Sequence, residues 1–125
     1  MNIVNIEKLD GHKRIVLTGR DKNVRVIAKH LKARLYYAPR DTDYFEDYPM
    51  VVNELQESLE YESGIVIVTT QSKEFLDSLL ESNFDFVLAT VRKYDHDDAD
   101  TYRLRVITKE YALECREAFN MEFRC

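Results

Sequence analysis

The stretch GIVIVTTQSKEFLDSLLE, residues 64–81, carries the strongest indication of the fold. Residues 65–70 form a continuous β-branched run without a polar face, which is typical of an interior parallel strand covered by helices on both sides. Residues 72–81 then repeat apolar side chains at helical spacing. The expected helix would bury Phe75, Leu76, Leu79 and Leu80. A buried strand followed at once by an amphipathic helix predicts an α/β fold.

Strands and helices alternate along the rest of the chain. Further strands are expected at residues 2–9, 14–18, 35–38, 84–91 and 101–107. Further helices are expected at residues 21–34, with Asp21 as N-cap, at 50–61, and from the N-cap Thr108 to about Phe119. The dipeptide Asp10-Gly11 predicts a tight turn, so the first two strands would form a hairpin. The predicted fold is a single α/β domain over residues 1–125: a three-layer sandwich with a mainly parallel sheet, an N-terminal hairpin and an antiparallel edge.

Composition limits the class of protein. Hydrophobic residues make up 45% of the 125 residues and charged residues 33%, which indicates a folded globular chain rather than a disordered one. No apolar stretch approaches the ~18 residues that span a bilayer, and no signal-peptide pattern is present, so no membrane partner is expected. Two cysteines, Cys115 and Cys125, do not make a disulfide framework. A cytoplasmic location is therefore expected.

The stretch RIVLTGRDKNVRVIAKHL, residues 14–31, has the outline of a phosphate-binding loop, because an apolar strand, a glycine and a helix follow one another. Such a loop needs a second glycine five residues on, then lysine and a serine or threonine. Counted from Gly19, those positions hold Val24, Arg25 and Val26. Valine resists positive φ, arginine lacks the compact ammonium group, and the second valine offers no oxygen to a metal. The loop cannot perform its usual chemistry.

Three segments together resemble a known family. TTQSKEF, residues 69–75, is similar to the Thr-Thr-His-Ser segment and helix start of SMC/RecF/OLD-like ATPases, relatives of the ABC cassettes. The first 19 residues resemble the opening hairpin of that family, and residues 84–119 resemble its closing strand, charged hairpin and helix. The resemblance implies a P-loop-NTPase-like fold. It also implies that Thr70, Gln71 and Ser72 form the H-loop, whose histidine senses the γ-phosphate, with Gln71 in place of that histidine.

The chain lacks the motifs that carry out ATP hydrolysis in this family. Only about thirty residues separate the first helix from Ile65, so the insertion, the ABC signature and the strand that ends in Asp-Glu are missing. Without the acidic pair there is no magnesium anchor and no group to orient the attacking water. We therefore expect no catalytic residue, no metal site, no cofactor and no ATP hydrolysis. What remains is a vestigial anion site at Gly19, Arg20, Lys22 and Arg25, because a helix N-terminus and three cations would attract a phosphate or a carboxylate weakly.

Two acidic segments are candidates for binding, one for a protein partner and one for a metal ion. Residues 41–48 interleave carboxylates with aromatic rings, and the partner-binding candidates there are Asp43, Tyr44, Phe45, Glu46, Asp47 and Tyr48. Exposed aromatics among acids suit a protein contact, whereas the alternative is that the rings only pack the loop against the domain. The acidic segment 94–100 lacks the glycine and the spaced glutamate of a calcium loop, so it is interpreted as a solvated hairpin tip.

Charge suggests a second class of function. Residues 1–40 carry 10 Lys/Arg and 3 Asp/Glu, a net charge of +7, whereas the remaining residues carry 8 Lys/Arg and 20 Asp/Glu, a net charge of −12. Such a chain could offer anion-binding and cation-binding surfaces at different places.

The leading hypothesis is a catalytically inactive ATPase-like domain that binds a protein, as regulator, mimic or inhibitor of a partner ATPase or its complex. The alternative is a small phosphate- or nucleic-acid-binding domain that uses Lys22, Arg25, Lys29 and Lys32 of the first helix. An unrelated enzyme on a similar sheet is the third hypothesis.

Overall fold

The computed structural model describes residues 1–39, 47–94 and 100–115. Within these residues one sheet contains the strands β1 (Asn2–Val4), β2 (Arg14–Thr18), β3 (Arg34–Tyr37), β4 (Val66–Thr69), β5 (Val87–Tyr94) and β6 (Thr101–Thr108). The helices are the 3₁₀ helix η1 (Ile6–Leu9) and the α-helices α1 (Asp21–Leu31), α2 (Tyr48–Leu59), α3 (Lys73–Glu81) and α4 (Lys109–Glu114). The alternation of strands and helices expected from the sequence is confirmed.

The sheet is mixed but mostly parallel. Its order is β1-β6-β5-β2-β4-β3, and β5, β2, β4 and β3 all run in the same direction. β6 is antiparallel to β5 and parallel to β1, so the two strands at that edge run against the other four. The mainly parallel sheet and the antiparallel edge were both predicted.

The prediction of an interior parallel strand at residues 65–70 is confirmed, because β4 lies between β2 and β3 and is parallel to both. Val66 and Val68 face one side of the sheet and Ile67 faces the other, and all three are fully buried. The sequence also predicts that this strand is flanked by residues 14–18 and 84–91 or by their neighbours. β2 does lie beside β4, but the strand on the other side is β3, and β5 lies on the far side of β2.

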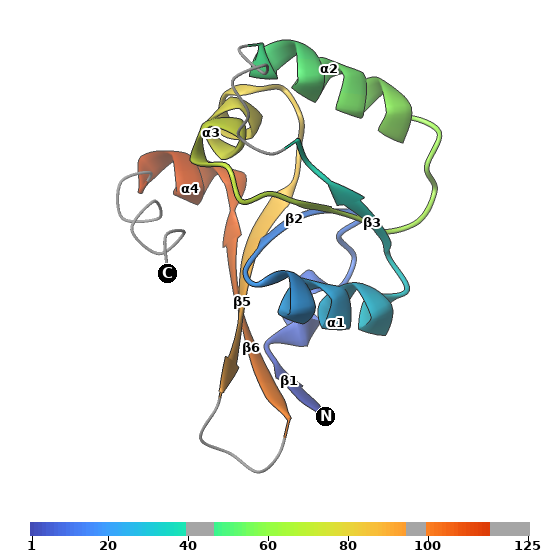
Figure 1. The fold of residues 1–125 in the computed structure, drawn as a ribbon, viewed down its shortest axis with the longest axis vertical. Coiled ribbons are helices and arrows are strands. Elements are labelled where there is room, and N and C mark those ends of the chain that lie inside the picture. Colours follow the sequence, from blue (N-terminus) through green and yellow to red (C-terminus); the bar gives the residue numbers. More distant parts are fainter. Residues whose placement is uncertain (40–46, 95–99, 116–125) are drawn as a thin grey trace.

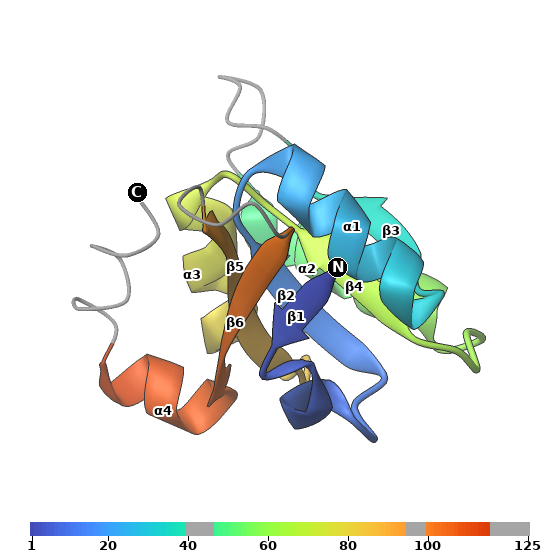
Figure 2. The same ribbon diagram turned by 90° about the horizontal axis from the view of Figure 1, so that it is seen from below.

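Helices cover both faces of the sheet, in agreement with a three-layer arrangement. The core on one face joins the sheet to α2, α3 and α4, and the core on the other face joins it to α1 and η1. Figure 1 shows α2 and α3 together at one end of the molecule, and Figure 2 shows α1 on one side of the sheet with α3 and α4 on the other. Adjacent strand residues therefore contribute to different cores, as Val16 and Leu17 of β2 do.

The predicted N-terminal hairpin is wrong. β1 ends at Val4, and Asn5 takes a left-handed conformation with φ 70°, which turns the chain into η1 instead of extending the strand. The Asn5 side chain donates a hydrogen bond to the carbonyl of Leu104 in β6, 3.0 Å away, and Leu9 is buried. The turn at Gly11, where φ is 81°, joins η1 to β2, so β1 pairs with β6 and not with β2.

Several element boundaries differ from those predicted. α1 ends at Leu31 and not at residue 34, because Lys32 adopts a left-handed conformation with φ 54°. β5 begins at Val87 and not at residue 84, because side chains bind the backbone of Phe84: its N–H donates to Ser82 Oγ and its carbonyl accepts from Lys109 Nζ.

The remaining helices begin close to where they were expected. α2 begins at residue 48, two residues before its predicted start, and ends two residues before its predicted end. Ser72 and Thr108 are the N-caps of α3 and α4, and their side chains accept hydrogen bonds from the N–H groups of Phe75 and Tyr111. The predicted end of the last helix, at Phe119, lies outside the described residues.

Candidate functional site

Two segments singled out in the sequence meet at the carboxyl edge of the sheet. β2 and β4 are parallel neighbours with Leu17 opposite Thr69, so the residues that follow them, 19–21 and 70–72, lie at the same edge. α1 leaves β2 toward one face of the sheet, and α3 leaves β4 toward the other. In open α/β sheets, this divergence opens the crevice in which ligands bind.

In this protein a side chain joins the two turns to each other. The side-chain amide of Gln71 donates a hydrogen bond from Nε2 to the carbonyl oxygen of Gly19, 2.8 Å away, although the two residues are 52 positions apart. Gln71 therefore ties the β4–α3 turn to the β2–α1 turn.

Gly19 is required by packing against β5. Its φ of 142° disfavours any residue with a Cβ atom, and a Cβ placed there would lie 2.8 Å from both Cγ1 and the carbonyl oxygen of Val91. The close approach of two backbones explains this glycine without a phosphate group.

Residues of α1 and its N-cap satisfy the hydrogen bonds and the charge at the start of this helix. Arg20 is the N-cap, contrary to the prediction of Asp21, and it caps through its backbone carbonyl, which accepts from the N–H groups of Asn23 and Val24. Asp21 is the first residue of the helix, and its carboxylate pairs with Arg25 at 2.9 Å. This carboxylate also accepts a hydrogen bond from the Tyr37 hydroxyl, which raises the pKa of Tyr37 above its usual value.

A negative charge thus already occupies the first turn of α1, where a bound anion would otherwise interact with the helix dipole. Arg20 and Lys22 are exposed beside it, and Arg25 is directed to Asp21. The four residues of the predicted anion site lie together, but one of its three cations is already paired.

Thr70 and Ser72 have local structural roles. Thr70 Oγ1 accepts a hydrogen bond from the Ser72 N–H at 3.0 Å, and Ser72 Oγ accepts from the Phe75 N–H at 3.1 Å. Both side chains are buried, whereas Gln71 between them is exposed. Of the three predicted H-loop residues, Gln71 alone is exposed and reaches the turn after β2.

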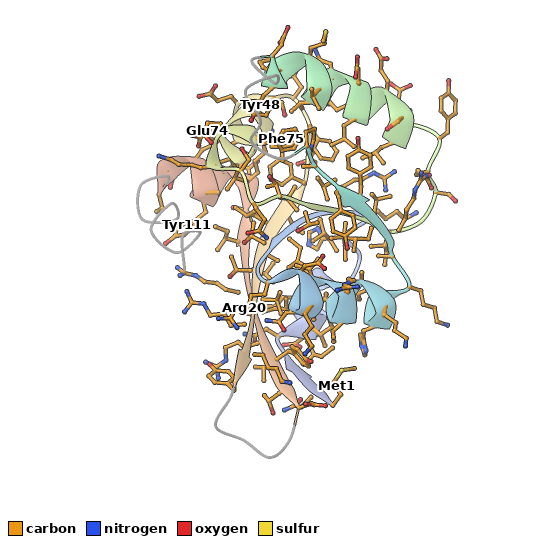
Figure 3. All side chains as sticks on the ribbon, viewed as in Figure 1. Met1, Arg20, Tyr48, Glu74, Phe75 and Tyr111 are labelled. Carbon is orange, nitrogen blue, oxygen red and sulfur yellow. The ribbon has the colours of Figure 1, made fainter. Side chains whose placement is uncertain are left out.

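The partner-binding candidates are only partly described. Asp43, Tyr44, Phe45 and Glu46 lie outside the described residues. Asp47 is the N-cap of α2, where Oδ1 accepts from the Met50 N–H at 3.2 Å, and Tyr48 is half-buried with its ring edge-on to Phe75 at 5.8 Å (Figure 3). Tyr48 therefore has the packing role that the sequence left as the alternative. The tip at residues 95–99 also lies outside the described residues.

A surface that the sequence did not reveal lies on β5 and β6. Arg92 and Tyr94 are two residues apart on β5, and Arg103 and Arg105 are two residues apart on β6. Because Arg92 lies opposite Arg103, all four side chains are on one face of the ribbon. Arginine or tyrosine at every second position of residues 92–94 and 103–105 is a signal that the sequence contains. Their meeting could not be predicted without the register of the hairpin.

Comparison with protein-family models, curated proteins and solved structures gave no match to this chain. In the part of the chain that the structure describes, no helix is both long and apolar enough to cross a membrane. In that same part, no three His, Cys, Asp or Glu residues are grouped so that they could hold a metal ion.

Proposed function

We propose that this chain is a catalytically inactive domain with an ATPase-like arrangement, related to the SMC/RecF/OLD-like core, and that it acts in the cytoplasm by binding a protein. The hydrogen bond between Gln71 and Gly19 is the observation that supports this proposal best. It joins the two turns between which a nucleotide phosphate would have to lie, and it uses groups of the chain itself.

The buried positions after Gly19 support the same conclusion. Val24 is fully buried and Val26 partly buried in the core beneath α1, at the positions where a phosphate loop has its second glycine and its magnesium-binding hydroxyl. Arg25, at the lysine position, pairs with Asp21. The side chains at these positions therefore pack in the core or form an ion pair within the helix, and none of them has the role that it would have in a phosphate loop.

A fold without this chemistry can still act through its surface, since function resides in sites and not in the fold as such. The protein partner that we propose would be an ATPase or a complex that contains one, with this domain as its regulator, mimic or inhibitor. The aromatic and arginine side chains exposed on β5 and β6 are of the types enriched in protein interfaces.

Phosphate release from ATP and GTP in the presence of magnesium tests the first half of the proposal. The wild-type chain and the Arg25→Ala variant should both release phosphate only at the rate of a protein-free control, because the residues that the structure describes include no metal anchor and no group at the start of α1 that would orient water. Turnover that co-purifies with the wild-type chain and is lost in Arg25→Ala would overturn the proposal. Chemical crosslinking in the native host, with identification of the captured protein, then tests whether the partner is an ATPase.

A further inference from the structure

The exposed ribbon of β5 and β6 carries an arginine face, which we define as Arg92, Tyr94, Arg103 and Arg105. It continues the side of the sheet on which Leu88 and Ile107 pack toward α3 and α4. All four residues of the arginine face are exposed. It therefore lies on the surface, next to the helical layer.

The arginine face places like charges opposite one another. Arg92 and Arg103 are direct cross-strand partners, and Arg105 is two residues further along β6, opposite Thr90. Like charges directly opposite each other destabilise a strand pair. Within residues 1–39, 47–94 and 100–115, neither Arg92 nor Arg103 forms an ion pair. A carboxylate placed between them would remove this repulsion.

The arginine face is also partly ordered in advance. The Arg103 guanidinium lies 5.1 Å above the centre of the Tyr94 ring, a cation–π contact that restricts the side chain. A hollow of about 180 Å³ lies between Thr90 and the four residues of the arginine face, and no carboxylate among the residues that the structure describes lines it. Guanidinium groups held in this way present forked donors that match the two oxygens of a carboxylate.

We propose that the arginine face docks an acidic segment of a partner protein. This inference rests on the proposed function and names the chemistry of the partner. A protein partner is favoured over a nucleic acid because the whole chain carries a net charge of −5, whereas nucleic-acid-binding domains are usually basic. Overall negative charge repels a long polyanion, while a short acidic segment meets mainly the local field of the arginines.

The test uses a short fluorescein-labelled peptide of Asp-Glu-Tyr repeats and measures its binding to the full chain by fluorescence anisotropy. Replacing Arg92 and Arg103 together by glutamine should weaken binding about tenfold, and added salt should weaken the binding of the wild-type chain. The matched control replaces the exposed Lys8 and Lys13 by glutamine, which removes the same charge from another surface and should change the affinity little. Arg103→Lys keeps the charge but loses the fork, so its affinity should be intermediate.

Three outcomes would overturn the inference: no binding of the acidic peptide, equal binding of an Asn-Gln-Tyr control peptide, or equal weakening in both double variants. Tighter, arginine-dependent binding of single-stranded oligothymidylate would assign the surface to nucleic acid instead. If the peptide does not bind and no nucleotide is turned over, only the docking inference fails, and the proposed function still stands. Magnesium-dependent turnover would defeat the proposed function whatever the peptide does.

Discussion

Replacing Gly19 by alanine should lower the free energy of unfolding by about 3 kcal/mol, since a non-glycine residue at this φ and an overpacked contact each cost about 1–3 kcal/mol. The φ of 142° is unfavourable for alanine, and the new Cβ would lie 2.8 Å from the side chain and from the backbone oxygen of Val91. Backbone atoms of β5 cannot move aside without disturbing the pairing of β5 with β2. Urea denaturation followed by circular dichroism measures the effect.

The other two glycines supply matched controls. Gly11→Ala changes a residue with φ 81° but no atom within 4 Å of the new Cβ, so it should cost only the conformational part, about 1–2 kcal/mol. Gly64→Ala introduces neither strain nor contact and should be close to neutral. If Gly19→Ala were as mild as Gly64→Ala, close packing on β5 could not be the reason for this glycine.

Replacing Arg14 by methionine should cost about 2–3 kcal/mol, the range for losing hydrogen bonds to a charged group. Its Nη1 donates to the carbonyls of Lys13 and Gly64 at 3.0 and 2.9 Å, and its Nη2 donates to those of Leu59 and Glu62 at 3.0 and 2.6 Å. One guanidinium thereby caps the carboxyl end of α2 and joins it to the start of β2. Its positive charge also complements the negative end of the helix dipole.

Arg34 supplies the matched control for Arg14. Its guanidinium forms an ion pair with Glu62 and is largely exposed, so Arg34→Met should cost less than about 1 kcal/mol. Arg14→Lys should recover only part of the loss, because an ammonium group cannot reach four carbonyls in the geometry of a fork. Equal urea midpoints for Arg14→Met and Arg34→Met would contradict the capping role of Arg14.

The features predictable from the sequence were those with a strong local pattern. The unbroken apolar run before Thr69 required two covered faces, and the apolar spacing in residues 72–81 fixed which side of α3 is buried. The prediction of an N-terminal hairpin failed because the first strand ends before Asn5. Asp10-Gly11 does form a turn, but it joins η1 to β2 and not one strand to another. A left-handed asparagine leaves little trace in a single sequence, since its conformation depends on the distant carbonyl of Leu104.

The candidate site was predictable only in part, for a related reason. Gly19 and Gln71 were selected separately, and their hydrogen bond follows from the parallel pairing of β2 with β4. The arginine face was missed because Arg92 and Arg103 become neighbours only through the register of the hairpin. Contacts between distant segments depend on strand order, which composition and periodicity do not specify.

We propose that the turn after β2 is closed by Gln71 and not by a nucleotide phosphate. The most direct measurement is a titration of the ¹⁵N-labelled chain with ATP and magnesium, following the backbone amide of Gly19 and the side-chain amide of Gln71 by NMR. We predict that both signals keep their positions up to millimolar ATP. Saturable, magnesium-dependent shifts of these two signals would contradict this proposal, because they would show a nucleotide binding between the turns that follow β2 and β4.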